Sequence, residues 1–229
     1  MSDAGSLSAE EGAGYFPAVE AMSTPEEAAY EARAHEGAIW TGGRVLIGAF
    51  AFAFAALAFA YFYLRSLNSE NLWRPHNVTA PTGPGAAIMA LSVAAAGLYV
   101  VAMRRLRTGR VLDWAVAGWS ATAAGLVAFG LQIWELTDLP FAPGMSGYSS
   151  VFIGWAGMNL LLLLTGLYWT ETLLARQIRL QRGAEAEGGG RDMLLSNRPF
   201  RVSAEACYAY WYFIALVSIF FWVFFYVAR

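Results

Sequence analysis

The sequence predicts an all-α membrane protein whose five transmembrane helices form a bundle, with the N-terminus in the cytoplasm and the C-terminus outside. Hydrophobic residues occupy 58% of its 229 positions and charged residues only 14%, a composition too apolar for an ordinary soluble domain. Five windows of about 20 residues contain no charged side chain, and a helix of that length crosses a bilayer core about 30 Å thick. The arginines gather in alternate connections, which indicates the orientation.

Charged residues mark the ends of the predicted spans. Arg44 and Arg65 flank the first window, Arg104 follows the second, and Asp113 and Glu135 flank the third. Buried helices of a soluble protein usually keep a polar stripe and are shorter, so we interpret the windows as membrane spans. In chain order, the predicted spans cover residues 45–64, 84–103, 114–134, 148–170 and 206–228.

Residues 1–40 differ from the rest of the chain in charge. They contain eight acidic residues but a single arginine, Arg33, and they lack the apolar stretch of a signal peptide. We therefore expect a flexible acidic N-terminal tail over 1–40 and a five-helix transmembrane domain over 41–229. Two irregular connections are also predicted, at 68–83, where prolines and asparagines accumulate, and at 182–191, which contains three consecutive glycines.

The chain has 15 arginines and no lysine, and the arginines are unevenly distributed. Four lie between the second and third spans and six between the fourth and fifth, two connections that share one side of a five-span protein. With Arg33 and Arg44, twelve arginines lie on the N-terminal side, and Arg65, Arg74 and Arg229 lie on the other. Because positively charged loops remain in the cytoplasm, the N-terminus is predicted to be inside.

The composition also excludes several functions. Without lysine the chain cannot form a Schiff base, as a retinal pump requires. Cys207 is the single cysteine, which excludes internal disulfides and thiolate clusters, and His35 and His76 are too few to hold haem through paired histidines. The net charge of −2 offers no basic surface for nucleic acid. We therefore predict no catalytic, cofactor or metal site within this chain, and no nucleic-acid partner.

Small residues recur at helical spacing in three of the spans. Such residues let helix backbones approach closely, which matters in lipid because apolar helices gain little by associating there. We expect these positions to face neighbouring helices inside the bundle. They are Ala49, Ala53, Ala56 and Ala60 in the first span, Ala86, Ala90 and Ala94 in the second, and Ala117, Ala121 and Gly125 in the third.

Few polar side chains interrupt the spans. Gln132 and Glu135 lie at the outer end of the third span and Asn159 lies within the fourth, whereas no Asp, Glu, Arg or His occupies the middle of any span. A proton or ion path usually requires ionisable groups at that depth. We therefore interpret Gln132 and Asn159 as residues that form hydrogen bonds between helices.

Aromatic residues crowd both ends of the last span, among them Tyr210, Trp211 and Tyr212 at its inner end. Tyrosine and tryptophan commonly anchor a helix at the level of the lipid headgroups, so we interpret these residues as an interfacial belt. A face for ordered lipid or for a large partner protein is the alternative interpretation.

Four motifs follow one another in a specific order. They are Ala60-Tyr61-Phe62-Tyr63-Leu64-Arg65, Gln132-Ile133-Trp134-Glu135, Tyr148-Ser149-Ser150-Val151-Phe152, and Glu205-Ala206 followed by Tyr210-Trp211-Tyr212-Phe213. Together with the predicted topology, they resemble subunit III of the haem-copper terminal oxidases in its short five-helix form, which lacks the first two of the usual seven helices. The resemblance covers residues 40 to 229.

The chain also departs from this family at titratable positions. The family's carboxylate in the first of these helices corresponds to Phe50, and its two histidines in the fourth span correspond to Asn159 and Leu162. In the last helix its histidine becomes Tyr212 and its aspartate becomes Ala215. Any role of those groups in proton delivery or in contact with lipid headgroups therefore does not carry over to this chain.

The resemblance implies a non-redox accessory subunit of cytochrome c oxidase, a respiratory complex of the bacterial plasma membrane that reduces oxygen to water and translocates protons. It places haem and copper in partner subunits, chiefly the catalytic subunit I, and it allows a bound phospholipid. It implies structural, lipid or partner contacts rather than catalysis for Gln132, Glu135, Asn159, Glu205, Trp211 and Tyr212.

Other functions stay open on the sequence alone. A subunit-III-like component of a quinol oxidase or of a nitric oxide reductase would carry similar motifs. A stand-alone membrane transporter would move a solute unaided and would be expected to contain a broken helix or paired polar sites. An assembly factor would be absent from the mature complex.

Overall fold

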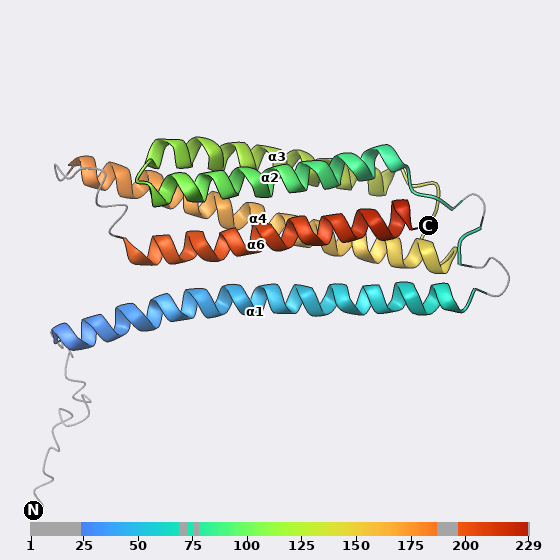
Figure 1. Cartoon of the computed structure of the whole chain (residues 1–229), viewed down its shortest axis with the longest axis horizontal. Helices are drawn as coiled ribbons and strands as arrows, with labels where there is room; N and C mark the ends of the chain where they lie inside the picture. The colour runs from blue at the N-terminus through green and yellow to red at the C-terminus, as the bar shows by residue number, and fades with distance from the viewer. Residues whose placement is uncertain (1–23, 69–72, 76–77, 187–196, 229) are drawn as a thin grey trace, which may run out of the picture.

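The computed structural model describes residues 24–68, 73–75, 78–186 and 197–228, and all regular secondary structure within these ranges is helical. Five long helices lie side by side with roughly parallel long axes (Figure 1). They are α1 (Pro25–Ser66), α2 (Thr82–Arg107), α3 (Val111–Thr137), α4 (Gly147–Ala186) and α6 (Arg198–Trp222), and the π-helical turn η1 (Val223–Val227) extends α6.

Each of these five helices is long and apolar enough to cross a membrane. The first four predicted windows each fall within one helix, and the last covers α6 and η1 and ends one residue beyond η1, at Ala228. The predictions of an all-helical chain and of a multi-pass membrane protein are confirmed at this level for the described residues. The orientation of the termini stays a prediction.

α1 begins well before its charge-free window. Thr24 caps the helix, because its Oγ1 accepts a hydrogen bond from the N–H of Glu27 at 3.3 Å and its own N–H donates to Glu27 Oε2 at 2.8 Å. Pro25 occupies the first turn, where a missing N–H breaks no helical bond. The tail predicted over 1–40 is therefore helical from residue 25 onward, and residues 1–23 lie outside the described ranges.

α4 likewise extends past its window, through Arg176, Arg179 and Arg182 to Ala186. The glycine-rich connection predicted at 182–191 therefore starts later, and residues 187–196 lie outside the described ranges. Absence of charge marks the part of a helix that fits into lipid, whereas alanine, leucine, arginine and glutamine favour helix on both sides of that boundary. The windows therefore located the helices but underestimated their lengths.

α6 occupies a central position among the helices. It packs against α1, α2 and α4, while α2 and α3 form the most extensive pair and α3 also contacts α4. The turn between α2 and α3 is short, and Gly109 adopts a positive φ of 75° there, which glycine tolerates because it has no Cβ. α1 packs against α4 and α6 along one side of the molecule, and much of its surface is exposed (Figure 1).

α3 presents small residues to the interior, as predicted. Ala121 and Gly125 are buried on one face of this helix. The Cβ of an alanine at position 125 would lie 2.7 Å from Cη2 of Trp211, so glycine leaves the room that this tryptophan needs. The same buried face continues at spacings of three and four residues to Gln132 and Glu135.

In α1 and α2 the small-residue prediction is wrong for four of the seven positions, whereas Ala53, Ala60 and Ala86 are partly buried. Several of the predicted positions point away from the interior and are exposed, namely Ala49, Ala56, Ala90 and Ala94. On α1 the larger Phe54 and Tyr61 are buried instead. On α2 a different set of small residues, among them Ala95 and Ala102, is buried beside Ile88 and Tyr99. Helical spacing of small residues does not by itself select the inward face, because that face must also fit the side chains of the neighbouring helices. On α1 large rings lie on both faces, and Phe52 and Phe59 are exposed.

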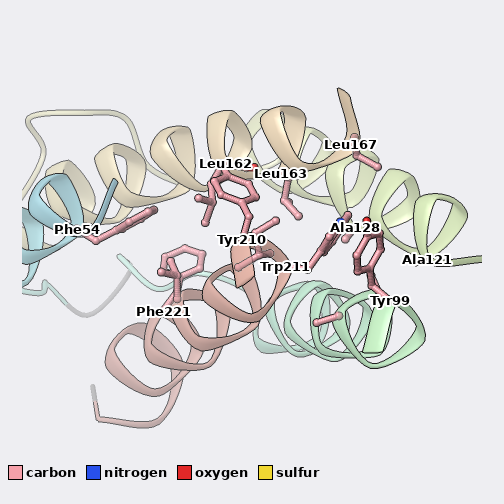
Figure 2. Close-up of a cluster of buried hydrophobic side chains, with 14 of the residues drawn as sticks. Phe54, Tyr99, Ala121, Ala128, Leu162, Leu163, Leu167, Tyr210, Trp211 and Phe221 are labelled. Carbon is pink, nitrogen blue, oxygen red and sulfur yellow. Dashed lines mark hydrogen bonds between the residues drawn. The ribbon is translucent and has the colours of Figure 1, made fainter. Parts of the chain in front are cut away.

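The core lies where α6 meets α3 and α4. Figure 2 shows Tyr210 and Trp211 projecting from α6, with Leu162 and Leu163 of α4 beside Tyr210 and Ala128 of α3 beside Trp211. All of these side chains are buried. The interfacial belt predicted for this part of the last span is therefore wrong for Tyr210 and Trp211, because neighbouring helices cover both.

Candidate functional site

Gln132 and Glu135 lie one turn apart on the buried face of α3, near its C-terminal end. Nε2 of Gln132 donates a hydrogen bond to Oε2 of Glu135 at 2.8 Å. Residues three apart on a helix are neighbours on its surface, so the Gln-x-x-Glu spacing itself brings these two groups together. Neither residue is exposed to solvent.

Two residues from other segments complete a buried polar cluster, which we define as Gln132, Glu135, Asn159 and Tyr226. Nδ2 of Asn159, on α4, donates to Oε1 of Gln132 at 3.0 Å. The hydroxyl of Tyr226, on η1, donates to Oε1 of Glu135 at 2.5 Å. Gly85 of α2 lies against the ring of Tyr226, where the Cβ of any other residue would overlap that ring. The polar cluster therefore joins α3, α4 and η1.

Nearly every polar atom of this cluster has a partner. Both carboxylate oxygens of Glu135 accept hydrogen bonds, and Oδ1 of Asn159 is the buried atom without a partner among the described residues. No cationic side chain in the described ranges forms an ion pair with Glu135. Sliding one helix past another would separate these buried groups, so the polar cluster specifies how α3, α4 and η1 align.

A second set of buried polar atoms links α6 to α4. Nε1 of Trp211 donates to Oγ1 of Thr170 at 2.8 Å, and that hydroxyl donates to the carbonyl of Gly166 at 2.8 Å. Sγ of Cys207 lies 3.6 Å from the same hydroxyl, and Cys207 is buried. Trp211 is therefore a packing and hydrogen-bonding residue of the interior.

The other two residues singled out from the sequence lie elsewhere. Oε1 of Glu205, on α6, lies 3.5 Å from Nη2 of Arg107, on α2, and the two side chains form an ion pair between these helices. Tyr212 is 63% exposed on α6. The six sequence-derived residues therefore do not form one site, because the structure brings together Gln132, Glu135 and Asn159 and separates them from the rest.

Sequence reasoning missed Tyr226 and Thr170. Tyr226 is one of many aromatic residues in the last span, and its partner Glu135 is 91 residues away along the chain, so no local signal distinguishes it. Thr170 carries one usable signal, because a threonine in an apolar helix commonly bonds the carbonyl four residues earlier, as it does here with Gly166.

One side of α1 forms an outward-facing apolar surface, which we call the α1 outer face and define as Val45, Gly48, Phe52, Ala56 and Phe59. Phe52 is 79% and Phe59 71% exposed, and Gly48 has open space where a Cβ would lie. Large and small residues alternate along this surface. In a membrane it would contact acyl chains or the helices of another chain.

The histidines add no ligand cluster. His35 is exposed on α1, and His76 lies outside the described ranges. Within those ranges, no group of three or more His, Cys, Asp or Glu side chains is arranged to hold a metal ion.

Together these features define a multi-pass helical membrane protein with a hydrogen-bonded polar cluster between its helices. No protein-family model matches the chain, and no curated protein matches it either. Its function is therefore inferred from its own residues, motifs and contacts.

Proposed function

We propose that this chain is a non-redox accessory subunit of a haem-copper oxidase, similar to subunit III of cytochrome c oxidase. It would bind the catalytic subunit I in the bacterial plasma membrane, with its N-terminus in the cytoplasm and its C-terminus outside. Haem and copper would belong to the partner subunits, which reduce oxygen to water and translocate protons. The role of this chain would be to stabilise that complex.

The observation that carries the proposal is the convergence of two family-like motifs on the end of the last helix. Glu135 belongs to the Gln-x-x-Glu motif, and Tyr148 begins the next motif along the chain. The hydroxyl of Tyr148 donates to the carbonyl of Phe225 at 3.1 Å, and the adjacent Tyr226 donates to Glu135. Motifs that meet in space support a common ancestry of the site better than motifs that merely occur in order.

The outward-facing small residues support an accessory role. Ala49 and Ala56 on α1, and Ala90 and Ala94 on α2, recur at helical spacing yet do not contact the interior. Lipid tails adapt to any apolar surface, whereas close approach of another helix requires small residues at the contact. These exposed positions therefore favour a protein partner over lipid on at least one side of α1.

Purification through a tag on this chain tests the proposal. The expected product contains a larger catalytic subunit, the absorbance spectrum of haem A and oxygen consumption driven by reduced cytochrome c. Electron supply from quinol, or reduction of nitric oxide instead of oxygen, would reassign the chain to one of the related complexes. A homogeneous chain without haem that moves a solute into liposomes would contradict the accessory role altogether.

A bulky residue on the α1 outer face tests whether a partner helix lies there. Ala56→Trp places a large ring on an exposed helix surface, so the isolated chain should still fold while the partner helix is displaced. We expect the amount of co-purified haem to fall severalfold at unchanged yield of the tagged chain.

Ala123→Trp is the matched control. Ala123 is exposed on α3, and α3 does not pack against α1 as α4 and α6 do. Equal retention of haem by the two variants would place the partner on another surface.

A further inference from the structure

A pocket of about 220 Å³ lies between α2 and α6, at the end of the bundle where α1 and α6 begin and α2 ends (Figure 1). Met103, Leu106 and Arg107 line it from α2, and Arg201 and Glu205 line it from α6. None of these residues belongs to the polar cluster. A group that occupies this pocket would therefore bind apart from that cluster.

The two arginines of this pocket have unused hydrogen-bonding capacity. Arg107 makes one contact of 3.5 Å with Glu205, which leaves most of its guanidinium donors without a partner among the described residues. The side chain of Arg201 is exposed and takes part in none of the ion pairs of the described ranges. Guanidinium groups bind carboxylates through parallel N–H donors, so the pocket suits acidic side chains.

The chain itself contains a segment of opposite charge. Residues 1–23 precede the cap of α1 and lie outside the described ranges. This segment contains Asp3, Glu10, Glu11 and Glu20, and it has no arginine, lysine or histidine. Glu10 and Glu11 are adjacent in the sequence, so together they can offer one carboxylate to each of two guanidinium groups. Charge complementarity therefore favours this segment as the occupant of the pocket.

The helix that follows this segment is attached beside the pocket. Oε1 of Glu36, on α1, lies 3.6 Å from Nε of Arg198, the first residue of α6. Arg201 is three residues further along α6, so it is a neighbour of Arg198 on the surface of that helix. The acidic segment therefore starts from the helix that contacts this part of α6.

The segment is also long enough to reach the pocket. Thr24 precedes Glu36 by twelve residues, which corresponds to about 18 Å along the axis of α1. Crossing one helix adds about 10–12 Å, the width of a helix with its side chains. The thirteen residues from Glu11 to Thr24 span up to about 43 Å when extended, which exceeds these two distances together.

We propose that the acidic segment 1–23 docks on the pocket between α2 and α6 of the same molecule, where the carboxylates of Glu10 and Glu11 contact Arg107 and Arg201. Exposed ion pairs are individually weak, but a tether supplies an effective concentration on the order of millimolar. The docked segment neutralises the pocket and restricts the access of other anionic groups to it. This inference does not depend on the proposed membership of an oxidase.

Disulfide cross-linking of the full chain, with any subunits that co-purify, tests the docking. Ala9→Cys places a thiol beside Glu10, and Thr108→Cys places one beside Arg107 at an exposed position, whereas the native cysteine is buried. We expect a mild oxidant to join the two positions within one chain, as identified by mass spectrometry of the linked peptides. Absence of this cross-link, or a cross-link between two chains only, would overturn the proposal in favour of another occupant.

Reversal of the pocket charge locates the contact. In the double-cysteine chain, Arg107→Glu with Arg201→Glu should slow the cross-linking about fivefold or more, because two attractions become repulsions. Arg176→Glu with Arg179→Glu is the matched control, since it reverses the same charge at exposed positions of α4 that do not line the pocket. Equal rates for the two variants would show that the overall charge of this end, rather than the pocket, attracts the segment.

Charge exchange guards against a folding defect. Glu10→Arg with Glu11→Arg should slow the cross-linking when the pocket is native, and these substitutions lie outside the described helices. Combined with Arg107→Glu and Arg201→Glu, they should restore the rate, because opposite charges face each other again. An unchanged rate for the segment variant alone, or no recovery in a combined variant that keeps the native midpoint of thermal unfolding, would refute the docking.

Discussion

The carboxylate of Glu135 lies in an apolar helical interior and depends on two donors, Tyr226 and Gln132. Removal of one partner from a buried polar group leaves a desolvated atom without a hydrogen bond. The loss of stability is therefore larger than the net contribution that an average hydrogen bond makes to the free energy of unfolding.

Tyr226→Phe tests this dependence at the scale of a single hydroxyl. We expect the free energy of unfolding to fall by about 1–3 kcal/mol, measured as a lower midpoint of thermal unfolding in detergent. Tyr63→Phe is the control, because Tyr63 is 53% exposed and its hydroxyl should contribute little. An equal midpoint for both variants would show that the carboxylate does not need this donor.

Gly125 provides a second residue-level test, since Trp211 occupies the space of a side chain at this position. Gly125→Ala should displace the indole, weaken its hydrogen bond to Thr170 and cost about 1–3 kcal/mol of stability. Gly130→Ala, on the same helix but with open space around it, should be neutral or slightly stabilising. Thermal unfolding of the two variants in parallel measures the difference.

At the level of elements, hydrogen bonds and a ring contact connect α1 to the end of the chain. The hydroxyl of Tyr61 donates to the carbonyl of Phe224 at 2.8 Å, and Arg65 donates to the carbonyl of Ala228. The rings of Tyr61 and Phe224 also stack at 5.4 Å between centroids. Carbonyls at a helix C-terminus lack partners within the helix, so these side chains provide the missing donors.

Arg65→Gln should therefore loosen one end of α1. We expect amide hydrogen exchange in the last turns of α1 and in η1 to become about tenfold faster or more, because a charged hydrogen bond between the elements is lost. Arg44→Gln is the control on the same helix, where Arg44 lies over the ring of Trp40 of α1 itself. Exchange that is equally fast in both variants would mean that packing alone holds α1.

Secondary structure was the more predictable part of each element, and its orientation the less predictable part. The windows 84–103 and 114–134 fall within α2 and α3, because the length of an uncharged run depends only on local composition. The face that turns inward depends on which neighbours are present. For this reason alanine spacing identified the buried face of α3 but not those of α1 and α2.

For the whole molecule, the distribution of arginines predicts that the C-terminus is outside the cytoplasm. Alkaline phosphatase fused after Arg229 should then be active, and green fluorescent protein fused at the same point should be dark. A fluorescent C-terminal fusion without phosphatase activity would invert the proposed orientation.

The polar cluster illustrates how much of the candidate site the sequence could reveal. Gln132, Glu135 and Asn159 stand out as rare polar residues in or beside apolar windows, and the bond between Gln132 and Glu135 follows from their spacing. The contribution of Tyr226 could not be predicted, since eleven tyrosines are present and its contact with Glu135 joins distant parts of the chain.

The sequence by itself determined the helical class, the number of apolar segments long enough to span a membrane, and the end of each segment that carries positive charge. These properties depend on residues that are neighbours in the sequence, because local composition sets the free energy of transfer of a segment into lipid. The tertiary structure alone decided that Trp211 is buried, that Ala56 faces outward and that Tyr226 reaches Glu135. These properties depend on which surfaces of separate helices meet, because close packing requires complementary shapes from residues far apart in the chain.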